Sequence, residues 1–215
     1  MTNILITGHS RWIWKYLNDN LRQNYQIFWF SRENGFDLRK KETFEKIKKI
    51  CHTELVSASI EKQDPEINSG WQKYLNILIL NAWIWEFWKF ENIGLEKYED
   101  IINLNLLANI RLLKVLEEKI NKDTKIIFIW SIISKKFMKY ASVYQASKFG
   151  LRWFAWGLKN EWKKVFLINP KIVDTDFHKW KIELDKRFTE TKLEDILDVV
   201  ENIIDWEEKR FEIDL

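Results

Sequence analysis

The sequence predicts an α/β fold with a doubly wound, mostly parallel sheet and helices on both faces. Three observations predict it. Short apolar runs alternate with segments of helical periodicity, the 215 residues have the length of one domain, and the first apolar run ends in the turn "TGHSRWIW". Because alternating strands and helices favour right-handed crossovers, we expect one domain over residues 1–215 whose ligands bind at the carboxyl ends of the strands.

The individual elements follow from periodicity and from the turn residues between them. Strands are predicted at Asn3–Thr7, Gln26–Ser31, Asn76–Leu80, Lys125–Trp130, Val165–Asn169 and Arg210–Leu215. Helices are predicted at Trp12–Asn24, Lys41–Ile50, Leu95–Ile120, Ser142–Trp162 and Lys192–Ile204. Residues 51–72 show neither periodicity, so we expect a surface insertion there, which costs little because loop closure depends only weakly on loop length.

Composition and charge exclude several classes of function. The net charge of +3 is small, and Lys and Glu alternate along the helical segments, which indicates a solvated surface and no nucleic-acid or membrane partner. The single cysteine, Cys51, excludes an internal disulfide, and the three histidines have no partners at metal-ligand spacing. With no apolar run of membrane-spanning length and no signal-peptide pattern in residues 1–7, we expect a cytoplasmic protein without a metal.

Glycine and tryptophan depart from usual composition in opposite directions. The chain has 6 glycines and 13 tryptophans. Glycine alone is about 3% of the chain against a usual ~7%, whereas the two together are about 9%, an ordinary glycine share for an α/β domain. The composition therefore indicates that tryptophan stands in for glycine.

The first turn after a strand supports this interpretation. Thr7 and Gly8 are followed by three residues and then by Trp12 and Trp14. With glycine at both tryptophan positions the turn would read TGxxxGxG, which resembles the nucleotide-binding turn of the short-chain dehydrogenase/reductase family. Such glycines let the backbone approach a pyrophosphate at a helix N-terminus, whereas indole rings would fill that space.

Five further motifs follow in the order of that family. "NAW" resembles its NAG motif, "YEDIINLNLLAN" resembles its helix with a catalytic asparagine, Ser131 precedes "YQASK" by the customary 13 residues, and "INPKIVDT" resembles NPGxVxT. Because the motifs cover nearly the whole chain, it is identified as a member of this family with a Rossmann-like fold. The resemblance implies the catalytic residues Ser131, Tyr144, Lys148 and Asn105.

The chemistry of these residue types fits carbonyl reduction. Tyr144 and Lys148 are four apart on a predicted helix and share a face, so the ammonium can lower the pKa of the phenol from its reference near ~10. The phenol would give a proton to a carbonyl oxygen as hydride arrives, and Ser131 would hydrogen-bond the same oxygen. By resemblance, Asn105 would hold a water that links Lys148 to a proton relay.

The end of the second strand favours NADP(H), with NAD(H) as the alternative. Arg32 follows Ser31 where an acidic residue would bind the adenosine 2′-hydroxyl, and with Arg11 it can pair with a 2′-phosphate. Asp37 and Leu38 resemble the adenine-contacting pair of the family. The expected cofactor-binding residues are Gly8, Ser10, Arg11, Trp12, Ile13, Trp14, Arg32, Asp37, Leu38, Asn81, Ala82, Trp83, Tyr144, Lys148, Pro170, Ile172 and Thr175.

The glycine positions of the family explain the composition. Trp12, Trp14, Trp83 and Trp130 match glycines that the family commonly has, and Trp85, Trp153 and Trp162 do so less firmly. We hypothesise that the source organism decodes UGA as glycine and that this sequence reads UGA as tryptophan. Lys171, which stands where the family has glycine after proline, is not explained in this way.

Two alternative functions would also account for these residues. If the tryptophans are native, the chain is a non-catalytic Rossmann-like binding or scaffold protein with a plugged nucleotide site. An extended-family epimerase or dehydratase is the other alternative, and the short tail after Thr175 disfavours it. For the enzyme we expect a small-molecule carbonyl or alcohol substrate and, by resemblance, a homodimer or homotetramer; the segment 176–190, which would set specificity, identifies no substrate.

Overall fold

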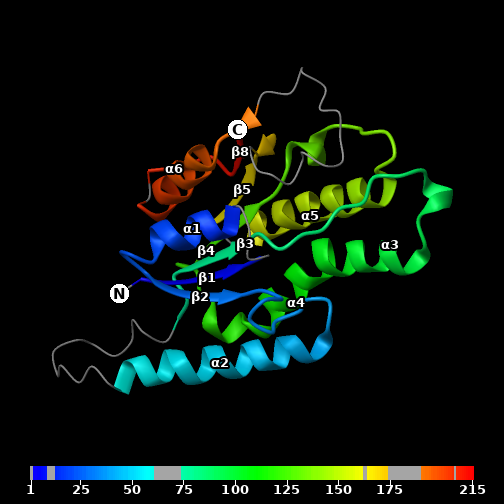
Figure 1. The fold of residues 1–215 in the computed structure, drawn as a ribbon. Helices are drawn as coiled ribbons and strands as arrows, with labels where there is room; N and C mark the ends of the chain where they lie inside the picture. Colours follow the sequence, from blue (N-terminus) through cyan, green and yellow to red (C-terminus); the bar gives the residue numbers. More distant parts are fainter. Residues whose placement is uncertain (1, 9–12, 61–73, 162–163, 174–189, 206) are drawn as a thin grey trace.

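The computed structural model describes residues 2–8, 13–60, 74–161, 164–173, 190–205 and 207–215. Within these residues, parallel strands form a six-stranded sheet in the order β2-β1-β3-β4-β5-β8 (Figure 1). The strands are β1 Asn3–Thr7, β2 Gln26–Phe30, β3 Ile77–Leu80, β4 Lys125–Ile129, β5 Val165–Asn169 and β8 Glu212–Asp214. Two short strands, β6 Ile172–Val173 and β7 Glu190–Thr191, pair separately.

Helices cover both faces of the sheet, which confirms the predicted doubly wound architecture. α1 and α6 lie on one face, and α2, α4 and α5 lie on the other, while α3 runs into α4 (Figure 1). Their bounds are α1 Ile13–Leu21, α2 Lys41–Ile60, α3 Leu95–Ile102, α4 Ala108–Val115, α5 Ser142–Glu161 and α6 Leu193–Ile204. Single 3-10 turns are formed by Phe90–Asn92, Glu117–Lys119 and Ile132–Lys135. None of the described helices is long and apolar enough to cross a membrane.

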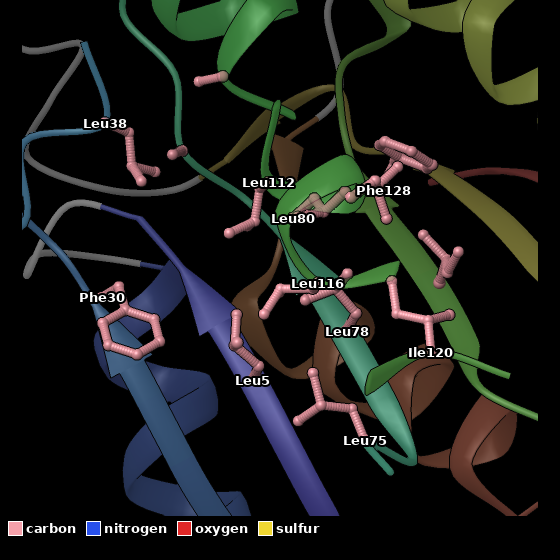
Figure 2. Close-up of a cluster of buried hydrophobic side chains, with 14 of the residues drawn as sticks. Leu5, Phe30, Leu38, Leu75, Leu78, Leu80, Leu112, Leu116, Ile120 and Phe128 are labelled. Atoms are coloured by element: carbon pink, nitrogen blue, oxygen red, sulfur yellow. The ribbon is translucent and has the colours of Figure 1, made fainter. Parts of the chain in front are cut away.

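The alternation of side chains along each strand divides the core into two clusters. Leu5 of β1 packs with α2 and α4, whereas its neighbours Ile4 and Ile6 pack with α1 and α6. Figure 2 shows the first cluster, in which Leu5, Leu78 and Phe128 from three strands meet side chains such as Leu112 of α4. Strands buried on both faces read as continuous apolar runs, so burial explains why these segments form an interior parallel sheet.

The order of the strands indicates at which part of the sheet a ligand would bind. β1 pairs with β2 on one side and with β3 on the other, so the chain changes direction across the sheet at β1. Thr7 at the end of β1 is opposite Phe30 and Leu80, the last residues of its two neighbours. Ligands of open α/β sheets bind outside the carboxyl ends of the strands at such a switch point.

The predicted end of the second helix was wrong. α2 continues past Ile50 to Ile60, so residues 51–60 are helical and only the rest of the predicted insertion, residues 61–72, lies outside the described residues. Phe44, Ile47 and Cys51 recur at helical spacing and are all buried in the core. A buried cysteine behaves as a small apolar residue, and counting it as such extends the helical pattern.

The last strand and the helix predicted after β3 also differ from their predicted bounds. The last strand is shorter, Glu212–Asp214, and its central residue Ile213 is buried in the core. The predicted helix Leu95–Ile120 is interrupted by a π-helical segment at Asn103–Leu107 and ends in a 3-10 turn. π-helical turns inside α-helices frequently mark functional sites, and this one contains Asn105.

Candidate active site

The turn after β1 requires glycine at its first position. Gly8 has a φ of 156°, and a Cβ atom there would lie 2.8 Å from Nδ2 of Asn81 and 3.4 Å from Cβ of Trp14. Its N–H donates to the carbonyl of Phe30 over 3.2 Å, which ties the end of β1 to β2. The predicted residues Ser10, Arg11 and Trp12 lie outside the described residues.

Trp14 fills the space beside this glycine. It is buried in the first turn of α1, next to the equally buried Ile13, and its ring lies 4.8 Å from that of Trp29 between centroids. Among the described residues, no hydrogen-bond partner reaches Trp14 Nε1. A buried unpaired N–H costs about 1–3 kcal/mol, so this indole is stabilised by packing alone.

The turn after β2 positions the predicted 2′-phosphate and adenine residues. Asn34 Oδ1 accepts from the N–H of Ser31 over 2.7 Å, which closes a turn that leaves Arg32 exposed. Asp37 is bound by Arg39 in an ion pair of 2.6 Å, and hydrogen bonding from that guanidinium holds the pKa of Asp37 below its usual value. Leu38, the other residue expected to contact adenine, is buried in the core.

The segment after β3 meets the end of β1. Asn81 and Ala82 are buried, and the N–H of Asn81 donates to Oγ1 of Thr7 over 3.3 Å. Asn81 Oδ1 is buried and has no hydrogen-bond partner among the described residues. Trp83 follows in a half-buried position. The end of β1 and the segment after β3, which carries predicted cofactor-binding residues, are therefore joined by a hydrogen bond.

Ser131 and Tyr144 come together as predicted. Ser131 follows β4 by two residues, and Tyr144 projects from the first turn of α5, where it is 4% exposed. Burial raises the pKa of Tyr144 above its ordinary value of 10, while a hydrogen bond with the Ser131 side chain opposes that rise. Ser131 Oγ also accepts from the N–H of Ile133 over 3.3 Å, which fixes the hydroxyl at the start of a 3-10 turn.

Burial dominates the pKa of Tyr144, and the expected lowering of this pKa by Lys148 stays a prediction. The side chain of Lys148 is fully buried, burial lowers its own pKa well below 10.5, and its Nζ lies 5.2 Å from the centroid of the phenol ring. Burial disfavours the charged form of an amine, so it works against the Coulombic effect that Lys148 is expected to exert on the phenol. No hydrogen bond reaches Nζ from the described residues.

Two indoles enclose the Lys148 side chain. Nζ lies 3.6 Å from the centroid of Trp130 and 4.9 Å from that of Trp83. Nε1 of Trp130 donates to the carbonyl of Lys148 over 2.9 Å, so the ring is fixed as well as packed. The lysine is therefore surrounded by aromatic rings at two positions where the family resemblance implies glycine.

Asn105 makes contacts that differ from the predicted ones. Its Oδ1 accepts from the N–H of Ile84, and its Nδ2 donates to the carbonyl of Ile84, each over 2.8 Å. Nδ2 also donates to Oγ of Ser147 over 3.0 Å, and Asn109 Nδ2 donates to the Asn105 carbonyl over 3.0 Å. Both Oδ1 and Nδ2 of the side chain thus bind protein groups. The predicted role of Asn105 in holding a relay water stays a prediction.

Sequence analysis missed three of these partners. Ile84, Ser147 and Asn109 contact Asn105, yet no chemistry was expected of them. Ser147 lies inside the "YQASK" motif and three residues after Tyr144, which is the spacing at which a helical serine can bond a carbonyl of the preceding turn. The spacing within the helix could have identified Ser147, and likewise Asn109, which lies four residues after Asn105. The contact of Ile84 joins separate elements, so the sequence gives no signal for it.

The segment after β5 is only partly described. Pro170 is buried, and its carbonyl accepts from the N–H of Ile132 over 3.0 Å, which joins this segment to the Ser131 turn. Ile172 begins β6, while Thr175 lies outside the described residues. Lys171 is tied by its N–H to Oγ1 of Thr191 over 3.0 Å. Among the described residues, no group of three or more His, Cys, Asp or Glu could hold a metal ion.

Comparison with solved structures identifies the same architecture in several enzymes. An alcohol dehydrogenase of Thermococcus sibiricus in complex with 5-hydroxy-NADP is 20% identical with a TM-score of 0.75, covering 100% of this chain and 96% of that one. A blue fluorescent protein from a metagenomic library, in complex with NADPH, is 16% identical with a TM-score of 0.76, covering 100% and 96%. A short chain dehydrogenase of Burkholderia cenocepacia in complex with NADP is 15% identical with a TM-score of 0.72, covering 99% and 87%.

Family models add evidence from the sequence itself. No curated protein matches the sequence significantly. At the identities given above, structural similarity establishes the fold alone. The model described as "short chain dehydrogenase", however, matches residues 3–185, which is most of the chain. The chain therefore belongs to the short-chain dehydrogenase family.

Proposed function

We propose that the protein is an NADP(H)-dependent oxidoreductase that interconverts a carbonyl and an alcohol on a small molecule. The observation that carries the proposal is the hydrogen bond between the Ser131 side chain and Tyr144, next to the buried Lys148. A donor that positions a substrate oxygen and a phenol that exchanges its proton are the two groups such a reaction needs. The cofactor, when bound, supplies or accepts the hydride.

The roles of the residues follow from their positions. Tyr144 gives its proton to the carbonyl oxygen in reduction and takes it back in oxidation, while Ser131 holds the same oxygen by a hydrogen bond. Lys148, if charged, lowers the pKa of the phenol and donates to ribose hydroxyls. Asn105 orients the segment after β3 through both polar groups of the Ile84 peptide.

NADP(H) is favoured over NAD(H) by the turn after β2. Arg32 is exposed beyond the end of this strand, where its guanidinium can pair with a 2′-phosphate, and no acidic side chain occupies the position of Ser31. Three structures with the same fold were solved with NADP, NADPH or 5-hydroxy-NADP, which supports the same choice here.

We further propose that the natural protein has glycine at the 13 tryptophan positions, because its source organism reads UGA as glycine. Two buried polar atoms at the site, Lys148 Nζ and Asn81 Oδ1, have no hydrogen-bond partner among the described residues and suit the hydroxyls of a ribose. With the indoles of Trp83 and Trp130 flanking Nζ, a ribose does not fit there. Glycine at both positions would leave the two atoms accessible.

One observation favours a second candidate, a non-catalytic binding or scaffold protein. If the tryptophans are native, Trp14 packs beside the Gly8 turn and Trp130 covers Lys148, so the nucleotide site is filled by the protein's own side chains. Trp88 and Trp153 would then remain as exposed indoles, 60% and 70% accessible, that a partner could cover.

A titration with NADPH, followed by fluorescence, distinguishes the two candidates. It is made on the chain as written and on a version with glycine at all 13 tryptophan positions. We expect binding by the glycine version alone, because only there is the site free of indoles. Equal or tighter binding by the chain as written would contradict both the recoding proposal and this account of the phosphate turn.

A further inference from the structure

Ser147 joins two elements of the site through a single hydroxyl. It lies on α5 between Tyr144 and Lys148 and is fully buried. Its Oγ donates to the carbonyl of Tyr144 over 2.6 Å and accepts from Nδ2 of Asn105 over 3.0 Å. A hydroxyl has one donor and two acceptor sites, so both bonds form at once. The helix that carries the proposed acid/base is thereby bonded to the π-helical segment between α3 and α4.

Asn105 extends this connection to a third element. Its Oδ1 and one Nδ2 hydrogen bind the N–H and the carbonyl of Ile84, and the other Nδ2 hydrogen binds Ser147. An amide side chain has two N–H donors, so its donor capacity is used completely. Because Asn105 and Ser147 are fully buried, the loss of either side chain leaves a buried polar group unpaired, and the network resists rearrangement as a unit.

We propose that Ser147 is a positioning residue of the active site. It keeps the turn of α5 with Tyr144 and Lys148 in fixed register with the segment Asn81–Ile84, on which the cofactor is expected to lie. A serine that only bonds a carbonyl in its own helix has a local effect. The second bond, to Asn105, makes the position of the α5 turn depend on an element far away in the sequence. The catalytic consequence rests on the proposed function, whereas the coupling itself does not.

The first test measures the coupling without cofactor or substrate. Amide hydrogen exchange at Ile84 is compared between the parent, Ser147→Ala and Ser134→Ala. Ser134 is a matched control because it is also fully buried and its Oγ has no hydrogen-bond partner among the described residues. We expect the exchange rate of the Ile84 amide to rise about tenfold in Ser147→Ala, because this factor corresponds to the loss of one buried hydrogen bond. The rate should stay unchanged in Ser134→Ala.

Other results would overturn the proposal. Unchanged exchange at Ile84 in folded Ser147→Ala shows that Asn105 holds the peptide without Ser147. If Ser147→Ala does not fold, Ser147→Thr, which keeps the hydroxyl, is the deciding variant. It should fold and keep the protection of the parent, and fast exchange at Ile84 in folded Ser147→Thr would contradict the role of the hydroxyl.

The second test measures positioning during turnover. In the version with glycine at the tryptophan positions, reduction of cyclohexanone and of small aldehydes by NADPH is followed for the parent, Ser147→Ala and Ser134→Ala. We expect kcat to fall about tenfold in Ser147→Ala while the Kd of NADPH stays within about twofold, together with a displaced basic limb of the pH profile. Unchanged kcat and pH profile would contradict positioning. No turnover in the parent would contradict the proposed function, and the exchange result at Ile84 would still decide the coupling.

Discussion

The ammonium nitrogen of Lys148 lies 3.6 Å from the centroid of the Trp130 ring, and Nε1 of that ring donates to the carbonyl of Lys148. A cation over an indole is attracted by the ring. Full burial nevertheless lowers the pKa of this lysine, because an apolar surrounding disfavours charge more than one aromatic ring restores it. Burial thus works against the role proposed for Lys148 as the pKa partner of Tyr144.

Three tryptophans among the described residues of the site are expected to weaken nucleotide binding. Trp14→Gly, Trp83→Gly and Trp130→Gly together remove the indoles beside Gly8 and Lys148, and we expect NADPH to bind at least about tenfold tighter than to the chain as written. The matched control is Trp88→Gly, Trp153→Gly and Trp156→Gly, three changes at exposed positions. Fluorescence titration of both variants measures the difference, and an equal gain in the control would show that the indoles at the site are not the obstacle.

Tyr144→Phe removes the proton that the proposed reaction transfers. In the glycine version we expect turnover with NADPH to fall by about three orders of magnitude or more, since the phenyl ring has no proton to give to the carbonyl oxygen. The Kd of NADPH should hardly change. Steady-state kinetics and fluorescence titration give the two quantities, and Tyr140→Phe, a change at a half-exposed phenol outside the site, is the control. Turnover retained in Tyr144→Phe would remove this residue from the mechanism.

Lys148 should make the stability of the chain as written depend on pH. Its pKa in the fold lies below the ordinary value near 10.5. Between these two values the unfolded chain binds more protons, so the free energy of unfolding rises with pH, by at most about 1.4 kcal/mol per pH unit. Lys148→Met should flatten the rise, as measured by urea unfolding from about pH 7 to about pH 9.5.

The control for this prediction is Lys139→Met, a change at an exposed lysine, which should leave the pH dependence as in the parent. Lys125, whose pKa burial lowers to about 8, adds a slope of the same sign above that pH in all three proteins. A slope that is the same in Lys148→Met as in the parent would mean that Lys148 is charged in the fold.

Glu212 connects the last strand to β5 and α5. Burial would raise its pKa, but hydrogen bonds from Arg152, Asn169 and Lys135 outweigh it and hold the pKa below the ordinary value. Because Glu212→Ala removes the carboxylate that binds Arg152 through two hydrogen bonds, we expect a loss of about 2–3 kcal/mol in the free energy of unfolding. Asp19→Ala, which breaks an exposed pair with Lys15, should cost at most about 0.5 kcal/mol. Urea unfolding measures both, and equal losses would contradict the importance of burial.

The recoding proposal predicts the mass of the natural protein. Trypsin cleaves after Lys125 and Lys135, so residues 126–135 form one peptide that contains Trp130 and no other tryptophan. In protein isolated from the source organism, this peptide should have the mass of the glycine sequence. Mass spectrometry of the same peptide from protein made in a host that reads UGA as tryptophan is the control. A tryptophan mass in the natural protein would contradict the proposal outright.

The sequence by itself determined the architecture, because periodicity and turn residues are local properties. Strand Asn3–Thr7 and strand Val165–Asn169 have the bounds that the sequence predicted, since buried parallel strands are continuous apolar runs between clear turns. Ser131, Tyr144 and Lys148 were predicted as one group from their order and spacing, and they lie together. The end of α2 was predicted wrongly because Cys51 was not counted as an apolar residue of the helix.

Only the tertiary structure decided which groups act on one another. The sequence placed Lys148 one turn after Tyr144, yet whether this amine is charged depends on burial and on Trp130, which comes from another strand. Likewise, the contacts of Asn105 with Ile84 and Ser147 join residues from three elements, and no local pattern encodes such pairs. Spacing along a chain fixes which side chains share a helix face, whereas solvation and hydrogen bonding across elements exist only once the chain has packed.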